Sequence, residues 1–224
     1  MSASIEGARI LQVRRLGTVG YDEALKLQAE LVGQRRSGAL PDQLLLLEHP
    51  HVITLGTSAA PDHVLVDEGE RARLGIAMHE VGRGGDVTYH GPGQLVGYPI
   101  LDLKPDRKDL HRYLRDLEQV LILAVTRLGV ANAGRRPGWT GVWTPEGKIA
   151  AIGVRVSSGW ITSHGFALNV DPDLDYFSTI VPCGIAEASV TSLARVLGRE
   201  VRMDEVIEAV LDGFTRVFGR ALHA

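Results

Sequence analysis

Residues 148–170 read KIAAIGVRVSSGWITSHGFALNV and predict two apolar strands, 148–157 and 160–170, joined at Ser158-Gly159. A short turn of this composition between two apolar runs is typical of a β-hairpin. Outward from this hairpin, we expect further strands at 43–48, 51–55, 76–81 and 94–103. Because strand pairs follow one another without intervening helices, the sequence favours an antiparallel or mixed sheet over a doubly wound parallel one.

Helices are predicted where apolar residues recur at three- and four-residue spacing. The clearest such segment is 106–128, and 22–37 and 204–218 show the same pattern. A shorter helix is predicted at 189–197, ending at Gly198, because glycine is common directly after a helix. We therefore expect an α+β protein in which helices pack on one main sheet.

Length and charge limit the classes of partner. The chain has 224 residues, with 24 Lys+Arg against 27 Asp+Glu, which gives a net charge of −3 at neutral pH. The length suits a single domain spanning 1–224, and the charge argues against nucleic acid as the main partner, since phosphate binding favours a basic surface. Residues 1–20 contain no long apolar run, so we expect no signal peptide, and no apolar run in the sequence reaches membrane-spanning length. A cytoplasmic protein with no membrane partner is expected.

The densest motif is the glycine-rich segment 82–97, GRGGDVTYHGPGQLVG. It is not a P-loop, because no Gly-Lys-Ser/Thr follows, and its glycine spacing departs from the dinucleotide-binding fingerprint. One interpretation is a rim of tight turns. The presence of Arg83, Asp86 and His90 among the glycines favours a loop that faces a ligand.

Cys183 is the only cysteine, so no intramolecular disulfide can form and a reducing compartment is indicated. A solitary cysteine is commonly a small buried apolar residue, and that alternative stays open. The other interpretation is a nucleophilic cysteine, which acts as the thiolate. The next residue, Gly184, can then present its N–H beside the sulfur as a donor to an oxyanion. A thiolate needs a nearby cation or base. The candidate is Lys148, at the mouth of an apolar strand, although it could be an exposed lysine at a hairpin tip; Lys108 is expected in solvent.

The histidines and carboxylates do not form a recognisable metal motif. His79-Glu80 lacks the second histidine of a zinc helix, and the aspartates at 171, 173 and 175 lack the glycine and the final ligand of a calcium loop. His90 and His164 remain candidates for orienting a ligand or the thiol. For His164, a structural role at a strand end is the alternative.

Several blocks of this sequence together resemble the lipoate-protein ligase B family, the octanoyl-[acyl-carrier-protein]:protein N-octanoyltransferases. The most specific is Arg83-Gly-Gly-Asp-Val-Thr-Tyr-His-Gly-Pro-Gly-Gln94. The others, in the family's order, are Leu44-Leu-Leu-Leu-Glu-His-Pro50, Lys148-Ile-Ala-Ala-Ile-Gly153, His164-Gly-Phe-Ala-Leu-Asn169 and Ile180-Val-Pro-Cys-Gly-Ile185. The resemblance implies a biotin/lipoyl protein ligase-like fold, with a large mixed sheet, a smaller sheet and flanking helices.

The resemblance also implies roles for individual residues. Cys183 matches the acyl-thioester nucleophile, and Lys148 matches the group that lowers the thiol's pKa and assists proton transfer. The residues that match the substrate-lining segments are Arg83, Gly84, Gly85, Asp86, Val87, Thr88, Tyr89, His90, Ala151, Ile152, Gly153, Gly165, Phe166 and Ala167. We add His164, which directly precedes the last of these segments, to the expected substrate-binding residues.

The implied reaction is transfer of an octanoyl group from octanoyl-acyl carrier protein to a lysine of a lipoyl domain. The implied acceptors are the lipoyl domains of 2-oxoacid dehydrogenases and the glycine cleavage H protein. Thioester-to-amide transfer runs downhill, so we expect no cofactor, ATP or metal. Two alternatives remain: an ATP-dependent lipoate/octanoate-protein ligase of the same fold, and a non-catalytic domain that binds lipoyl or acyl-carrier partners. Basic pairs at 14–15 and 135–136 could steer an acidic carrier.

Overall fold

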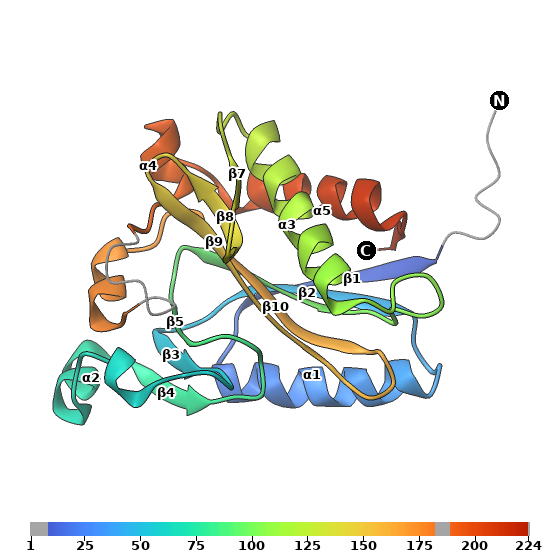
Figure 1. Ribbon diagram of the computed structural model, residues 1–224, viewed down its shortest axis with the longest axis horizontal. Coiled ribbons are helices and arrows are strands. Elements are labelled where there is room, and N and C mark those ends of the chain that lie inside the picture. Colours follow the sequence, from blue (N-terminus) through green and yellow to red (C-terminus); the bar gives the residue numbers. More distant parts are fainter. Residues whose placement is uncertain (1–8, 182–188, 224) are drawn as a thin grey trace.

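The structure, a computed structural model, describes residues 9–181 and 189–223. Within these residues, strands form one eight-stranded sheet in the order β11-β1-β2-β6-β10-β9-β8-β7 (Figure 1). The strands are β1 Ile10–Thr18, β2 Asp42–Glu48, β6 Gln94–Ile100, β7 Gly134–Arg136, β8 Trp139–Thr144, β9 Gly147–Val156, β10 Thr162–Asn169 and β11 Ala221–His223. A three-stranded sheet has the order β4-β3-β5, formed by β3 Val52–Leu55, β4 Ala77–Glu80 and β5 Val87–His90.

The large sheet is mixed. Strand β1 runs parallel to β2 and to β11, whereas the pairs β2–β6, β6–β10, β10–β9, β9–β8 and β8–β7 are antiparallel. In the β9–β10 hairpin, Thr162 lies opposite Val156 and Leu168 lies opposite Ala150. The predicted hairpin, the mixed sheet and the α+β class are therefore confirmed.

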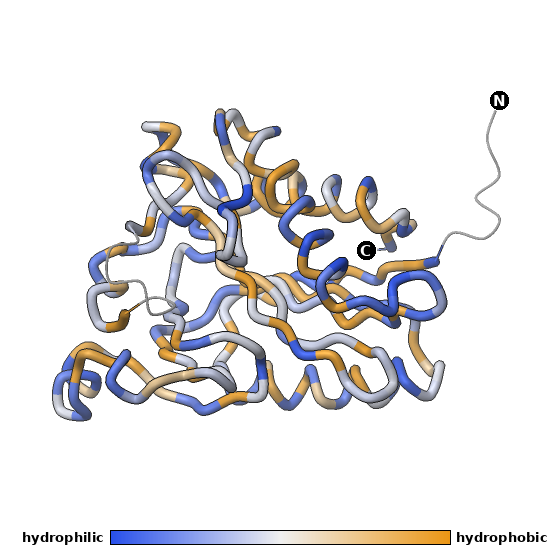
Figure 2. The backbone as a smooth tube through the Cα atoms, viewed as in Figure 1, coloured by the Kyte–Doolittle hydropathy of each residue, from blue (hydrophilic) through white to orange (hydrophobic). Residues whose placement is uncertain are grey.

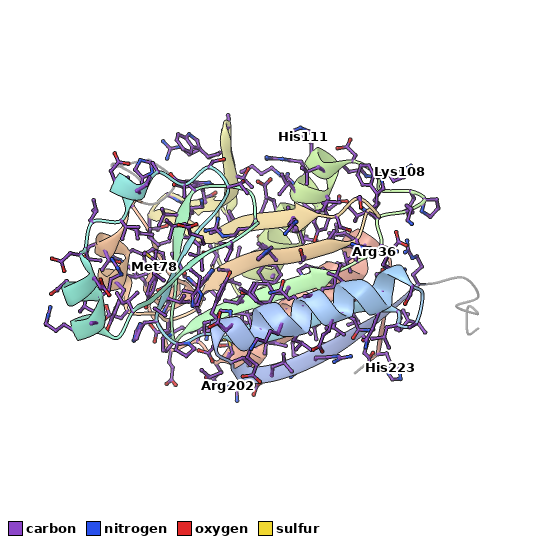
Figure 3. All side chains as sticks on the ribbon, turned by 90° about the horizontal axis from the view of Figure 1, so that it is seen from below. Arg36, Met78, Lys108, His111, Arg202 and His223 are labelled. Carbon is purple, nitrogen blue, oxygen red and sulfur yellow. The ribbon has the colours of Figure 1, made fainter. Side chains whose placement is uncertain are left out.

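Helices cover both faces of the large sheet. The helices of the described residues are α1 Tyr21–Arg36, α2 Glu68–Leu74, α3 Leu110–Arg127, α4 Leu193–Leu197 and α5 Met203–Phe218, with short 3₁₀ helices at Pro61–His63 and Leu174–Thr179. Of these, α2 packs with the small sheet and not with the large one. Figure 2 shows hydrophobic and hydrophilic residues alternating along α3, as expected for a helix with one buried side. Seen from below, α1 lies across one face of the large sheet (Figure 3).

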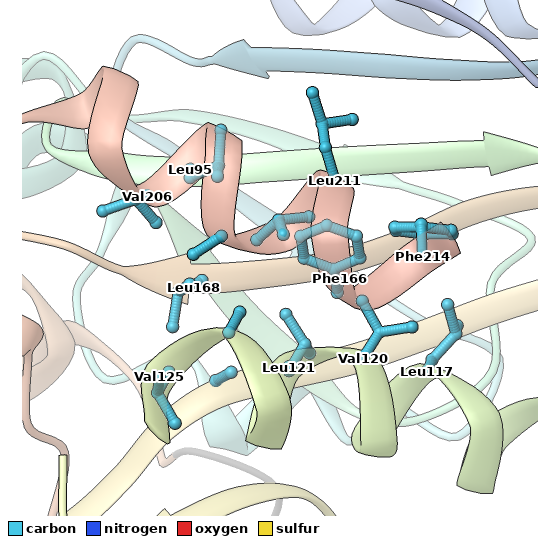
Figure 4. Close-up of a cluster of buried hydrophobic side chains, with 14 of the residues drawn as sticks. Leu95, Leu117, Val120, Leu121, Val125, Phe166, Leu168, Val206, Leu211 and Phe214 are labelled. Carbon is cyan, nitrogen blue, oxygen red and sulfur yellow. The ribbon is translucent and has the colours of Figure 1, made fainter. Parts of the chain in front are cut away.

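The leucines of β2 show why helices are needed on both faces. Leu44 and Leu46 belong to the core beneath α3 and α5, whereas Leu45 and Leu47 belong to the core beneath α1. Successive side chains of a strand point to opposite faces, so a run of four leucines requires cover on both sides. In the α3–α5 core, Phe166 of β10 packs between these two helices (Figure 4).

No helix of the described residues is long and apolar enough to cross a lipid bilayer.

Two predicted helix starts are wrong, and side-chain caps explain both. Helix α3 begins at Leu110 and not at 106, because the Asp109 side chain accepts a hydrogen bond from the Arg112 N–H and caps the helix there. Helix α4 begins at Leu193, capped by Ser192. The preceding residues 189–191 pair with β9 and do not extend the helix, as the Lys148–Val190 bridge shows.

Candidate active site

A cavity of about 490 Å³ opens where the small sheet meets the centre of the large one. Its wall brings together three separate blocks of the sequence: the glycine-rich segment, β9 and β10. The expected substrate-lining residues that it contains are Arg83, Gly84, Gly85, Asp86, Val87, Thr88, His90, Ala151, Ile152, Gly153, His164, Gly165, Phe166 and Ala167, and Lys148 lies on the same wall. Residues up to about 80 positions apart in sequence therefore share one surface.

Tyr89 and Cys183 differ from the other residues of the expected set. Tyr89 is 1% exposed and packs in the core of the small sheet, where its hydroxyl lies 2.7 Å from His51 Nδ1. It points to the face of β5 opposite the cavity, because neighbouring strand residues alternate in direction. Cys183 lies outside the described residues.

The glycine-rich loop is held in place by Arg83, whose side chain is 6% exposed. Its guanidinium donates to the Thr54 carbonyl at 2.7 Å and to Thr54 Oγ1 at 2.8 Å, both on β3. Gly85 has φ of +89°, a conformation that glycine adopts without strain. Asp86 accepts hydrogen bonds from His63 Nδ1 at 2.6 Å and from the Val87 N–H at 2.8 Å. Arg83 and Asp86 therefore brace the loop from both sides.

Two histidines of the cavity wall are neutral. His90 Nδ1 donates to Gln94 Oε1 at 2.7 Å, which leaves Nε2 as an acceptor. Burial lowers the pKa of His90 to about 3, and burial together with the nearby Arg83 and Arg155 charges lowers the pKa of His164 to about 4. Each side chain is 7% exposed. The inner wall thus carries imidazoles without adding charge to an apolar cavity.

These histidines should make stability depend on pH. In the unfolded chain they take up protons near pH 6.5, whereas the folded state resists protonation until about pH 3 to 4. The unfolded state therefore binds more protons in this window, and the free energy of unfolding falls as the pH drops, by up to about 1.4 kcal/mol per pH unit for each histidine. Calorimetry at pH 7 and pH 5 measures this loss. It should be smaller in His164→Asn, and an equal loss in that variant contradicts the assignment.

Lys148 is held on the cavity wall by its neighbours on β8. The residue is only 9% exposed, and its Nζ lies 5.4 Å from the centre of the Trp143 ring. A Cβ built on Gly141 would come within 2.7 Å of Lys148 Cε, so the absence of a side chain at Gly141 makes room for the lysine. The Gly141 N–H donates to Oε1 of the fully buried Glu118 on α3, at 3.0 Å. Lys148 is therefore a buried wall residue and not a lysine exposed at a hairpin tip.

The residues that flank 182–188 are attached beside this wall. Before the segment, the Val181 N–H donates to the His63 carbonyl at 2.8 Å, and the His63 side chain in turn contacts Asp86. After it, the Ser189 carbonyl accepts from the Lys148 N–H at 2.9 Å. Both ends of the segment that contains Cys183 thus connect to residues next to the cavity.

Other cavity residues were not predicted from the sequence. They are Tyr21, Ser58, Tyr98, Leu110, Leu114, Trp139, Thr140 and Val154. The i, i+4 spacing of Leu110 and Leu114 was the available signal, because it places both on one face of the amphipathic α3. Trp139 and Thr140 lie on β8, a strand that the sequence pattern did not predict.

The basic pairs considered as carrier-docking sites have local partners. Arg14 donates to Gln43 Oε1, Arg15 pairs with Glu208, and Arg135 pairs with Glu118. The Arg136 guanidinium lies 5.1 Å from the Trp143 ring centre.

Among residues 9–181 and 189–223, no group of three or more His, Cys, Asp or Glu could hold a metal ion.

The chain is similar to known proteins in sequence and in fold. Residues 20–215 match the family described as lipoyl protein ligase A/B catalytic domain. The octanoyltransferase of Rubrobacter xylanophilus is 55% identical over 212 residues, covering 93% of this chain and 94% of that protein. A bipartite lipoate protein ligase of Thermoplasma acidophilum superposes with a TM-score of 0.73 at 22% identity, covering 96% of this chain and 85% of that one. The biotin protein ligase of Aquifex aeolicus gives a TM-score of 0.53 at 13% identity, covering 93% and 69%.

The structural similarities confirm the expected lipoyl and biotin ligase fold. The sequence similarity extends over nearly the whole of both chains and includes the glycine-rich segment, β9 and β10. The 55% sequence identity is far above what a shared fold alone would produce. The chain therefore belongs to the octanoyltransferase family of the lipoyl protein ligase A/B catalytic domain, and it is an acyltransferase.

Proposed function

We propose that this enzyme transfers an octanoyl group from octanoyl-acyl carrier protein to a lysine of a lipoyl domain through a thioester on Cys183. The observation that carries the proposal is the cavity with the buried Lys148 on its wall and the flanks of the Cys183 segment attached beside it. A lysine cation near a thiol favours the thiolate, which is the reactive form.

In the first step, the Cys183 thiolate attacks the carbonyl carbon of the donor thioester. A new carbon–sulfur bond forms to Cys183, and the bond to the carrier's sulfur breaks. The departing thiolate takes a proton from the Lys148 ammonium, so the products are an S-octanoyl enzyme and the free thiol of the carrier. Lys148 is left as a neutral amine.

In the second step, the lysine amine of the acceptor attacks the same carbonyl carbon. The carbon–nitrogen bond forms, the bond to Cys183 breaks, and the nitrogen's proton passes to the neutral Lys148 amine. This restores the thiolate–ammonium pair and leaves an amide-linked octanoyl group. The energy of the donor thioester drives the transfer, so no separate activation step is required.

The cavity wall suits an apolar chain. Ile152, Phe166 and Leu114 present hydrocarbon to its interior, and the two imidazoles are neutral. Burying seven apolar carbons at about 0.8 kcal/mol each contributes roughly 5–6 kcal/mol. One carbon more or less changes binding by only about one such increment, so discrimination by chain length should be modest.

The proposed acceptors are the lipoyl domains of 2-oxoacid dehydrogenases and the glycine cleavage H protein. The archaeal ligase that shares this fold was studied together with its E2 lipoyl domain, which supports an acceptor of that class.

Mass spectrometry of the intact protein tests the thioester. After mixing with octanoyl-acyl carrier protein and no ATP, we expect one octanoyl adduct that hydroxylamine removes and that a lipoyl domain discharges. Because Cys183 is the only cysteine, Cys183→Ala should carry no adduct. Transfer that survives in Cys183→Ala and requires ATP would instead identify a ligase. A stable complex without any mass change would identify a binding domain.

A further inference from the structure

Three buried side chains form a continuous line of hydrogen bonds from the glycine-rich segment into β10 and beyond. His90 Nδ1 donates to Gln94 Oε1 at 2.7 Å, and Gln94 Nε2 donates to Asn169 Oδ1 at 2.9 Å. Asn169 Nδ2 then donates to the Thr191 carbonyl at 2.9 Å. Gln94 is 1% exposed, Asn169 5% and Thr191 0%. Water therefore cannot readily replace any of these bonds.

The line ends on the backbone of Lys148. The Thr191 N–H donates to the Lys148 carbonyl at 3.0 Å, and the Lys148 N–H donates to the Ser189 carbonyl at 2.9 Å. Val190 is the parallel bridge partner of Lys148. Residues 189–191 are thus bonded to Lys148 on one side and to Asn169 on the other.

The position of this line follows from where the sheet stops. The β9–β10 pairing ends at Ala150 opposite Leu168, two residues before Lys148 is reached. At Lys148, which still pairs with Trp143 of β8 on one side, the partner on the other side is Val190 and no longer β10. Asn169 is the last residue of β10, so its side chain connects the end of the sheet to the segment that replaces β10 beside Lys148.

We propose that Gln94 and Asn169 are positioning residues, which hold residues 189–191 against Lys148 and so keep its amine at a constant place relative to the cavity wall that carries His90. The effect on catalysis rests on the proposed function of Lys148. Gln94 and Asn169 do not line the acyl cavity, so they act through Lys148 and not on the substrate. Small displacements of a catalytic group can cost about 100-fold in rate.

Asn169→Leu tests the proposal, because leucine keeps the shape of the side chain and removes both of its hydrogen bonds. We expect kcat for octanoyl transfer to fall about 10- to 100-fold, with little change in KM for the donor. The rate at which iodoacetamide alkylates Cys183, measured against pH, should show its midpoint at higher pH. The chain has no other cysteine, so this readout reports one thiol.

Gln94→Met and Gln43→Leu are the matched variants. Gln94→Met breaks the same line of hydrogen bonds one step earlier without adding charge. It replaces Asn169→Leu as the test if that variant does not fold. We expect it to raise the midpoint of Cys183 alkylation as well, by a smaller amount. Gln43 is a fully buried amide on β2 that donates to Gln12 Oε1 at 3.0 Å and to the Pro41 carbonyl at 3.1 Å. Gln43→Leu should lower the melting temperature and leave both kcat and the alkylation midpoint unchanged.

Lys148→Met separates this proposal from the proposed function. If Lys148→Met leaves the alkylation midpoint unchanged, the role of Lys148 is wrong. If Lys148→Met raises the midpoint while folded Asn169→Leu and Gln94→Met behave like Gln43→Leu, the positioning role is overturned and the proposed function stands. A raised midpoint in Lys148→Met and in either amide variant supports both.

Discussion

Lys148→Met is expected to slow octanoyl transfer by about 10²- to 10⁴-fold, the range that removal of a general acid–base group commonly costs. Methionine keeps the apolar stem that packs beside Trp143 and Gly141 but lacks the amine. Both half-reactions should slow, because in the proposed mechanism the amine favours the thiolate in the first step and accepts a proton in the second. Single-turnover measurements of Cys183 acylation, and of its discharge to a lipoyl domain, resolve the two effects.

Lys108→Met is the control. The Lys108 Nζ also lies over an indole ring, 5.8 Å from the centre of Trp160, but the residue is exposed and is not part of the cavity (Figure 3). Its replacement removes a lysine–tryptophan contact of the same kind and should leave both rates as in the wild type. Rates for Lys148→Met within threefold of the wild type would remove the lysine from the mechanism.

Gly165→Ala is expected to destabilise the fold by at least about 3 kcal/mol, the upper part of the usual range for overpacking. A Cβ at this position would lie 2.1 Å from the Gly97 carbonyl oxygen on the neighbouring strand β6 and 2.6 Å from Pro99 Cδ. Backbone atoms of paired strands cannot move apart without breaking the ladder. For a protein of this size, we expect the melting temperature to fall by about 6–12 °C.

Gly33→Ala is the matched glycine replacement. Gly33 lies inside α1 and is exposed, and a Cβ added there would have no neighbouring atom within 4 Å. Alanine is the better helix former by about 0.5–1 kcal/mol, so this variant should be slightly more stable than the wild type. Thermal melts of the two variants should therefore shift in opposite directions. A melt of Gly165→Ala that matches the wild type would show that β6 and β10 can separate locally.

Periodicity predicted the long elements well because it reports burial directly. Helices α1, α3 and α5 each present one apolar side to a sheet, and the β9–β10 hairpin has a clear turn between two apolar runs. Strand β1 was missed, since the adjacent charges of Arg14 and Arg15 interrupt any simple alternation. Strand β7 has only three residues and carries no pattern.

The sequence by itself determined the α+β class and the principal helices, because side-chain spacing encodes which residues are buried, and its motifs marked the blocks that line the cavity. Apart from the β9–β10 hairpin, only the tertiary structure decided which strands became neighbours. Thus Tyr89 faces the core while His90 faces the cavity, and residues 189–191 replace β10 beside Lys148. The physical reason is that backbone hydrogen bonds are the same for every residue. Side chains distant in sequence also take part where the β9–β10 pairing ends, as Asn169 does by donating to the Thr191 carbonyl, and no local pattern identifies such a contact.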